Sequence, residues 1–309
     1  MTKNVLEIIN LQKKIKDHEI VKGITLSVKE SEVFGFLGHN GAGKTTTIRM
    51  IMGLIKPTAG TVKICGYDIR DNFTKAMEHV GCIIESPDMY KYMSGTDNLK
   101  HFANMYGNIT QSRIDEVVEL VGLTKRIGDK VEEYSTGMCQ RLGLAQAILS
   151  KPKLLILDEP TNGLDPSGIR EFRELIIHLA REEKMGVFVS SHILSEIQLM
   201  CQRVAVIQMG EVLTVAEVSE LIQEGKTIWE LDQPKKAQVL LESKFGISSQ
   251  ITEDAKLSAS ISPQQLMEIN QMFVQNAIQI AYVSKESESL EEIFLHLTKA
   301  KGETIAQTS

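Results

Sequence analysis

A glycine-rich loop followed by a lysine and threonines is the segment of this 309-residue chain best suited to chemistry. It reads GHNGAGKTT (38–46), follows the apolar run 33–37, and precedes apolar residues at helical spacing from Ile48 to Ile55. Between a strand and a helix, such a loop turns backbone N–H groups around phosphate oxygens, while Lys44 reaches the terminal phosphates and Thr45 binds Mg²⁺. A chance glycine-rich turn is the alternative, which the flanking strand and helix disfavour. The predicted nucleotide-binding residues are Gly38, His39, Asn40, Gly41, Ala42, Gly43, Lys44, Thr45 and Thr46.

Two acids at the end of a second apolar run complement this loop. The sequence LLILDEP (154–160) predicts a buried strand that ends at Asp158 and Glu159. An aspartate there holds Mg²⁺ beside Thr45, directly or through water, and the next glutamate polarises an attacking water. The alternative is solvated surface charge. We therefore expect Asp158 to be a metal residue and Glu159 to be catalytic.

Alternating apolar strands and helices position these motifs and predict an α/β fold with a largely parallel sheet. Residues 97–150 are typical of helices. A turn near residues 220–226 separates the last third of the chain from the part before it. The last third has its own alternation of strands and helices. Its predicted elements are strands at 227–231, 255–261 and 277–283 and helices at 234–245, 263–275 and 290–299. We expect a nucleotide-binding cassette over 1–222, with a helical subdomain over about 86–150, and a small C-terminal α/β domain over 226–309.

Composition excludes other classes of protein. The longest uncharged stretch, 269–284, has 16 residues and five Asn or Gln, whereas a spanning helix needs about 20 mostly apolar residues. From residue 211 onward the chain has 15 acidic residues, 8 Lys and no Arg, so it is a poor nucleic-acid binder. The four cysteines lack metal-type or paired spacing, which favours small core hydrophobes.

A third motif indicates the family. The sequence YSTGMCQRLGLAQAIL (134–149) resembles the signature of ATP-binding cassette (ABC) proteins, which reads LSGGQ-x-QR or, in one branch, YSLGM-x-QRL. The alternative is an ordinary helix start with Ser135 as N-cap. The resemblance implies that Ser135, Gly137 and Met138 contact the nucleotide held by a partner subunit. It also implies a P-loop NTPase cassette with a mostly parallel sheet core, an antiparallel β part and a helical subdomain.

Further elements of the ABC family follow in order. Residues 162–165 (NGLD) resemble the D-loop, which crosses the dimer interface. His192 matches the switch histidine, which contacts the γ-phosphate and helps to position the water. A lone histidine after a strand is usually structural, but the order of motifs favours a catalytic role. At the position where the family usually stacks an aromatic ring on adenine, this chain has Ile15. The resemblance therefore implies only an apolar contact with the base, and it does not indicate whether the protein prefers ATP or GTP.

Glu85, in VGCIIESPDMY (80–90), replaces the glutamine of the family's Q-loop, which touches Mg²⁺ and relays nucleotide state to the membrane subunit. With YSTGM and the ending SLEEIFLHLT (289–298), this resembles the bacitracin-resistance and lantibiotic self-protection transporters of Gram-positive bacteria. Beside a triphosphate the extra charge requires compensation by Mg²⁺, or by a Lys, an Arg or a backbone N–H of the membrane partner. The alternative is an incidental, solvent-facing acid.

The resemblance implies an ATPase that acts as a homodimer with two sandwiched ATP molecules and Mg²⁺. It docks on a separate membrane permease at the cytoplasmic face of the membrane, without nucleic acid, and expels antimicrobial peptides. A drug or polyketide exporter is the alternative within transporters. Soluble ABC proteins that act on ribosomes or DNA usually carry two cassettes or a coiled-coil insertion, and neither is present. A small-molecule P-loop kinase would leave the signature and His192 unexplained.

Overall fold

The computed structural model describes residues 3–221, 226–252 and 254–286. The chain divides into two compact units, 1–218 and 219–309. The expected helix at 290–299 lies outside the described residues. Among the residues that are described, no helix combines the length and apolar character needed to cross a membrane.

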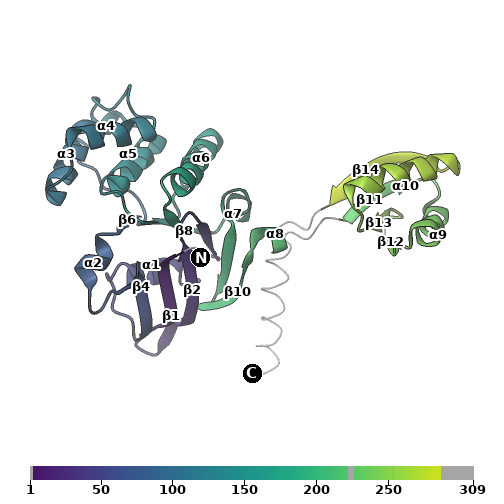
Figure 1. Ribbon diagram of the computed structural model, residues 1–309, viewed down its shortest axis with the longest axis horizontal. Helices are drawn as coiled ribbons and strands as arrows, with labels where there is room; N and C mark the ends of the chain where they lie inside the picture. Colours follow the sequence, from purple (N-terminus) through teal and green to yellow (C-terminus); the bar gives the residue numbers. More distant parts are fainter. Residues whose placement is uncertain (1–2, 222–225, 253, 287–309) are drawn as a thin grey trace. The chain divides into compact units, whose positions relative to one another are not determined.

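The first unit contains a six-stranded sheet with the order β10-β9-β3-β8-β7-β6 (Figure 1). Five neighbouring strands are parallel, and only β10 runs antiparallel, to β9. The strands are β3 (Val33–Leu37), β6 (Val80–Ile83), β7 (Leu154–Asp158), β8 (Gly186–Ser191), β9 (Arg203–Gln208) and β10 (Glu211–Glu217). All five residues of both β3 and β7 are buried, which explains why each is a continuous apolar run in the sequence.

A second, antiparallel sheet of the same unit has the order β2-β1-β4-β5. Its strands are β1 (Asn4–Ile15), β2 (His18–Lys29), β4 (Ala59–Ile64) and β5 (Tyr67–Asp68). Helix α1 (Lys44–Ile51) buries Ile48 and Ile51 in one core with Leu6 and Ile8 of this sheet and Phe36 of the parallel sheet. The helix that follows the phosphate loop is therefore fixed between the two sheets.

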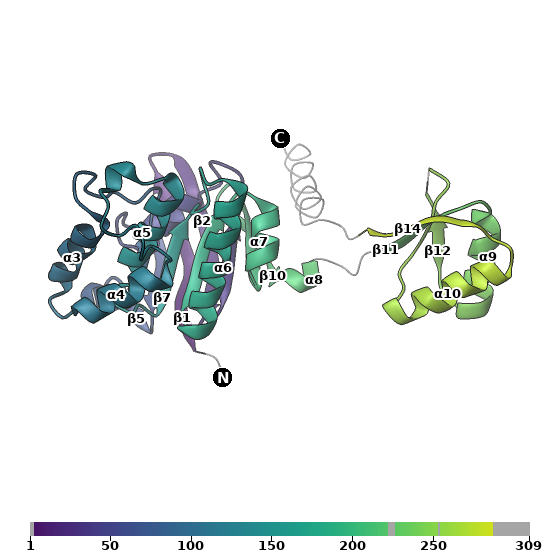
Figure 2. The ribbon, with the colours of Figure 1, turned by 90° about the horizontal axis from the view of Figure 1, so that it is seen from above.

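Helices α3, α4 and α5 gather to one side of the sheets and form the helical subdomain (Figure 1), while α6 and α7 lie side by side elsewhere on the unit (Figure 2). Helix α2 is a short helix of the same unit, and the short helix α8 crosses the division between residues 218 and 219. The bounds are α2 (Phe73–Met77), α3 (Gly95–Tyr106), α4 (Gln111–Leu120), α5 (Thr136–Ile148), α6 (Pro166–Glu182), α7 (Leu194–Met200) and α8 (Val218–Leu221).

The second unit is a β-α-β-β-α-β arrangement with the sheet order β12-β13-β11-β14, the ferredoxin-like topology. Its elements are β11 (Lys226–Leu231), α9 (Pro234–Phe245), β12 (Ser249–Ile251), β13 (Leu257–Ala259), α10 (Pro263–Gln275) and β14 (Ile280–Glu286). Every strand pair is antiparallel. Both helices pack on one face of the sheet around Trp229, whose indole N–H donates to Asn270 at 2.7 Å.

Candidate active site

The phosphate loop joins the end of β3 to the start of α1, as the sequence predicted. Gly41 and Gly43 have positive φ values of 80° and 105°. Residues other than glycine rarely adopt this backbone conformation. Gly38 is confined differently, because a Cβ atom there would lie 2.6 Å from the carbonyl oxygen of Ile207 in β9. These glycines give the loop the sharply turned backbone that cradles phosphate.

Lys44, the first residue of α1, is buried under this loop. Its Nζ donates hydrogen bonds to the carbonyl oxygens of Gly38 at 2.7 Å and His39 at 3.2 Å. The same Nζ lies 3.0 Å from Oε1 of Glu159. The lysine is therefore held by two loop carbonyls and one carboxylate.

Glu159 follows directly after β7 and connects three functional side chains. Its φ is +47°, and its amide N–H donates to Oγ of Ser190 at 3.0 Å. While Oε1 faces Lys44, Oε2 accepts a hydrogen bond from Asn162 at 2.7 Å and lies 2.9 Å from Nδ1 of His192. The structure thus brings together the predicted catalytic residues Glu159 and His192 and the phosphate-loop lysine.

Opposing effects determine the charge of Glu159. Burial raises the pKa of its carboxyl, but hydrogen bonds from Asn162 and Lys44, and the charges of Lys44 and His192, lower it. The net pKa lies below the ordinary value for glutamate. The carboxylate is therefore ionised at neutral pH, as acceptance of a proton from water requires.

A cleft of about 400 Å³ adjoins this cluster and includes the predicted metal residues. Its lining consists of Thr45, Glu85, Ser86, Gln140, Asp158, Glu159 and Asn162. Asp158 is buried and accepts a hydrogen bond from the Ser190 hydroxyl. The expected metal residues Thr45, Asp158 and Glu85 thus share one cavity.

The donor set of this cleft fits a magnesium ion bound together with phosphate. In the part of the chain that the structure describes, no group of three or more His, Cys, Asp or Glu could hold a metal by itself. Mg²⁺ is typically held by one or two carboxylates, with water and substrate phosphates as its other ligands. Gln140 also lines this cleft, although its Oε1 is buried and has no hydrogen-bond partner among the described residues.

Glu85 has a partner that sequence reasoning missed. It has a φ of +64°, and its Oε1 accepts a hydrogen bond from the guanidinium of Arg49 at 2.6 Å. The sequence named Mg²⁺ or a group of the membrane partner as the source of compensation, and the structure adds a cation from α1 of the same chain. Arg49 is four residues after Thr45, and side chains at that spacing share a helix face. This spacing could have revealed the pair.

The signature residues 135–138 line a different cleft, of about 540 Å³, together with Gly163, Leu164, Asp165, Ser167 and Gly168. Ser135 is the N-cap of α5, and its Oγ accepts from the amide of Met138 at 3.3 Å. Asp165 caps α6 in the same way, accepting from the amide of Gly168 at 2.9 Å. The signature and the expected D-loop therefore face each other, and the signature does not line the cleft of its own Thr45 and Asp158.

Ile15 lies at the end of β1, paired with His18, and is 47% exposed. It lines neither of these clefts. Its exposed side chain presents an apolar surface, but no described contact joins it to the phosphate loop.

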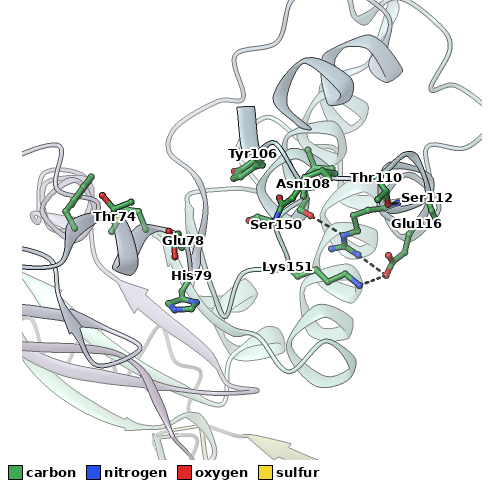
Figure 3. A pocket seen from close by; sticks show the side chains of 15 residues that line it. Thr74, Glu78, His79, Tyr106, Asn108, Thr110, Ser112, Glu116, Ser150 and Lys151 are labelled. Atoms are coloured by element: carbon green, nitrogen blue, oxygen red, sulfur yellow. Dashed lines mark hydrogen bonds and ion pairs between the residues drawn. The ribbon is translucent and has the colours of Figure 1, made fainter. Parts of the chain in front are cut away.

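A third depression, of about 940 Å³, lies where α2 approaches the helical subdomain (Figure 3). Arg113 of α4 is buried at its wall and donates to the carbonyl oxygens of Ile148 and Leu149 at the end of α5. Glu116 forms ion pairs with Arg113 at 2.8 Å and with Lys151 at 3.6 Å. No phosphate-loop residue lines this depression, and these contacts fix the C-terminal end of the signature helix.

A turned glycine loop between a parallel strand and a helix, facing an Asp-Glu pair at the end of another parallel strand, defines a P-loop nucleoside triphosphatase cassette. The chain belongs to the family of ABC transporter ATP-binding proteins. The ABC transporter family profile matches residues 21–162.

Relatives match nearly the whole chain. It is 48% identical to the uncharacterized ABC transporter ATP-binding protein YhcH of Bacillus subtilis, covering 98% of this chain and 97% of that protein. Identity to the bacitracin transport ATP-binding protein BcrA of Bacillus licheniformis is 39%, over 95% and 97% of the two chains. Identity to the linearmycin resistance ATP-binding protein LnrL of B. subtilis is 33%, over 95% and 98%.

A solved ATP-binding subunit of an ABC transporter covers 70% of this chain and 91% of its own, with a TM-score of 0.63 and 27% identity. These comparisons confirm the predicted fold class and family. The protein is an ATP-hydrolysing subunit of an ABC transporter, a class that works with separate membrane permease components.

Proposed function

We propose that this subunit drives the export of antimicrobial peptides of the bacitracin or lantibiotic type, and so confers resistance or self-immunity on a Gram-positive bacterium. The supporting observation is the 39% identity to a bacitracin transport ATP-binding protein over 95% of this chain, which includes the C-terminal unit. The subunit acts as a homodimer at the cytoplasmic face of the membrane, bound to its permease.

Nucleotide binding begins at the Lys44 cluster. The terminal phosphates replace Glu159 as the anionic partner of Lys44, while the backbone N–H groups of residues 38–46 and the start of α1 surround the phosphate oxygens. Thr45 and Asp158 hold Mg²⁺ when it is bound, and the metal neutralises charge that develops on the phosphates. Adenine has no aromatic partner at Ile15, so affinity for the base depends on apolar contact alone.

Released from Lys44, Glu159 becomes the acceptor for the proton of the attacking water. Its lowered pKa keeps it ionised, and Asn162 at 2.7 Å fixes one of its oxygens. His192, 2.9 Å from the same oxygen, orients the carboxylate and contacts the γ-phosphate. Glu159 and His192 therefore already contact each other, and Glu159 becomes available as the base once phosphate has replaced it at Lys44.

Each nucleotide site is completed by a second copy of the chain. Within one chain the signature turn 135–138 lines a cleft separate from that of Thr45 and Asp158. In a head-to-tail homodimer, Ser135, Gly137 and Met138 reach the nucleotide of the partner, and the start of α5 adds its N-terminal amides. Binding closes the dimer, and hydrolysis reopens it.

A drug exporter is the second candidate, favoured by the 33% identity to a linearmycin resistance ATP-binding protein over nearly the full chain. Both candidates share the ATPase cycle and differ in the cargo, which the permease contacts.

The test combines a sensitivity panel with a site variant. The chain and its neighbouring permease are expressed in a sensitive Gram-positive host, and inhibitory concentrations are measured for bacitracin, a lantibiotic and several drugs. We expect protection against the peptides. Lys44→Ala should abolish it, because loss of the charged hydrogen bonds to phosphate weakens ATP binding at least about 100-fold. The exposed Lys125→Ala is the matched control. Protection against drugs alone would replace the peptide assignment.

A further inference from the structure

Ser190 is a buried hydroxyl residue to which the proposed ATPase cycle gives no role. It lies near the end of β8, is 0% exposed, and pairs with Asp158 of β7 on one side and Phe36 of β3 on the other. Strand β8 therefore lies between the strand that leads into the phosphate loop and the strand that ends at the acid pair. The carbonyl oxygen of the next residue, Ser191, accepts a hydrogen bond from the amide of Gly38 at 3.3 Å. The end of β8 thus adjoins both halves of the nucleotide site.

The Ser190 hydroxyl makes two hydrogen bonds of opposite direction. Its Oγ donates a proton to Oδ1 of Asp158, and the same Oγ accepts from the amide N–H of Glu159 at 3.0 Å. A serine hydroxyl has one proton and two lone pairs, so these contacts fix its rotation. The proton points at the carboxylate expected to hold the metal, and a lone pair faces the backbone of the expected base. One side chain therefore contacts both members of the acid pair.

The backbone of Glu159 depends on these contacts. Its φ of +47° lies in the left-handed region, which is unfavourable for residues other than glycine. The carbonyl oxygen of Ser190 accepts from the same Glu159 amide at 3.2 Å, so two oxygens of one residue hold this turn. Replacement of the hydroxyl alone leaves the carbonyl contact in place. The effect of the hydroxyl on the acid pair can therefore be measured separately from the contact between the two strands.

The orientation of the Asp158 carboxylate matters most for Mg²⁺. This ion demands near-ideal octahedral geometry at about 2.0 to 2.1 Å, whereas Ca²⁺ takes about six to eight oxygen ligands in flexible arrangements. Asp158 is 2% exposed, and the hydrogen bond to its Oδ1 restricts rotation of the carboxylate. Loss of that hydrogen bond should consequently disturb binding of Mg²⁺ more than binding of Ca²⁺.

We infer that Ser190 is a positioning residue for ATP hydrolysis: its hydroxyl holds the Asp158 carboxylate in the orientation that Mg²⁺ requires and, through the amide of Glu159, fixes the base relative to that carboxylate. The inference rests on the roles proposed above for Asp158 and Glu159. It makes a neutral hydroxyl on β8 responsible for the preference of the site for Mg²⁺ over Ca²⁺.

The test compares two replacements of nearly the same shape. Ser190→Thr keeps the hydroxyl and Ser190→Val lacks it, so any strain from added bulk affects both, while Ser190→Ala removes the hydroxyl without added bulk. Ser258→Ala, which removes a buried serine hydroxyl from β13 of the second unit, is the control. The dissociation constant of a fluorescent non-hydrolysable ATP analogue is measured in EDTA, in Mg²⁺ and in Ca²⁺. Steady-state phosphate release gives kcat and KM for ATP.

In Ser190→Ala and Ser190→Val, we expect the gain in analogue affinity on adding Mg²⁺ to fall about 3- to 10-fold, the loss of one hydrogen bond. The gain from Ca²⁺ should change less than about threefold, because Ca²⁺ tolerates a rotated carboxylate. The kcat of both variants should fall at least about 10-fold, and analogue binding in EDTA should not change. Ser190→Thr and Ser258→Ala should stay within about threefold of wild type in every measurement.

Equal behaviour of the Thr and Val variants would overturn the inference, as would an undiminished Mg²⁺-dependent gain in Ser190→Ala. Equal losses with Mg²⁺ and Ca²⁺ would also overturn it, because a purely structural role does not distinguish the two ions. If both larger side chains prevent folding, Ser190→Ala against wild type decides the matter alone. An unchanged Mg²⁺-dependent gain in Asp158→Asn would instead refute the role proposed for Asp158, whatever the Ser190 variants show.

Discussion

Glu159→Gln should separate nucleotide binding from hydrolysis, and the structure gives a reason for both effects. In the structure the Glu159 carboxylate forms an ion pair, at 3.0 Å, with Lys44, the only lysine of the phosphate loop. Phosphate has to displace it. The amide of glutamine carries no charge, so it releases Lys44 more easily but cannot accept the proton of water.

The expected gain in affinity follows from burial. The side chain of Lys44 is 4% exposed and that of Glu159 is 20% exposed, so solvent screens this pair little. Hydrogen bonds to charged groups contribute about 1.5 to 3 kcal/mol, but Lys44 keeps its bonds to Gly38 and His39, and glutamine retains a neutral acceptor. A net change of about 1 kcal/mol corresponds to roughly fivefold tighter ATP binding. Turnover should fall about 10²- to 10⁴-fold with loss of the base.

Isothermal titration with ATP in EDTA measures the affinity, and phosphate release with Mg²⁺ measures turnover. Glu174→Gln is the matched control, because it removes the same charge from an exposed ion pair with Arg170. With ATP and Mg²⁺, the Glu159→Gln protein should accumulate as a dimer on size exclusion. Unchanged ATP affinity would refute the Lys44–Glu159 competition, and wild-type turnover would show that Glu159 is not the base.

The same carboxylate should make stability depend on pH. Since the pKa of Glu159 is lower in the folded protein than its ordinary value, its ionised form stabilises the fold above the unfolded pKa, about 4.5. This contribution is lost as pH falls through the folded pKa. The difference in Tm between wild type and Glu159→Gln should therefore be constant from about pH 6 to 8 and shrink below about pH 4.5. A Tm difference between the two proteins that persists at pH 3 would show that ionisation of Glu159 is not its cause.

Three further outcomes are expected. Arg49→Ala should weaken MgATP binding by at most about fivefold, because the Arg49–Glu85 pair is largely exposed, and Arg49→Ala/Glu85→Gln should restore it; equal losses in both backgrounds would show that Arg49 acts independently of Glu85. Ser135→Ala/Gly137→Asp should stop hydrolysis and spare ATP binding, and mixing with Lys44→Ala subunits should recover activity; no recovery at any ratio would count against composite sites. Burial raises the pKa of the Cys201 thiol, so it should resist iodoacetamide in the folded protein at pH 8, and rapid labelling seen by mass spectrometry would contradict its place against Gly35.

Local sequence predicted the motif-bearing elements well because each depends on its own residues. Strands β3 and β7 are apolar runs buried on both faces, and α9 covers 234–245, the range that apolar spacing predicted. The C-terminal sheet was harder. The expected strand 255–261 is shorter, at Leu257–Ala259, and a further strand, Ser249–Ile251, pairs with it. Both strands have only three residues, too few to show a periodicity.

Sequence could not show which side chains pair across the site. Lys44 and Glu159 are 115 residues apart, and nothing in either motif indicates that these two side chains form an ion pair. The buried, unpartnered Oε1 of Gln140 is also not predictable, because the signature pattern fixes the residue type but not its hydrogen bonds. Such features depend on how β7, α1 and α5 pack, which only tertiary structure defines.

These pairings balance the charges of a cleft that is lined by three acids. Like charges in one cavity repel, and an uncompensated buried carboxylate is costly. Each acid here has its own partner: Glu159 pairs with Lys44, Asp158 accepts from Ser190, and Glu85 pairs with Arg49. A bound metal and triphosphate would replace the partner of Glu159, while the Arg49 pair lies on the exposed side of the cleft and can persist. This charge balance predicts an order of events: we expect Lys44 to exchange partners first, and the proposed base Glu159 to become available only after phosphate has bound.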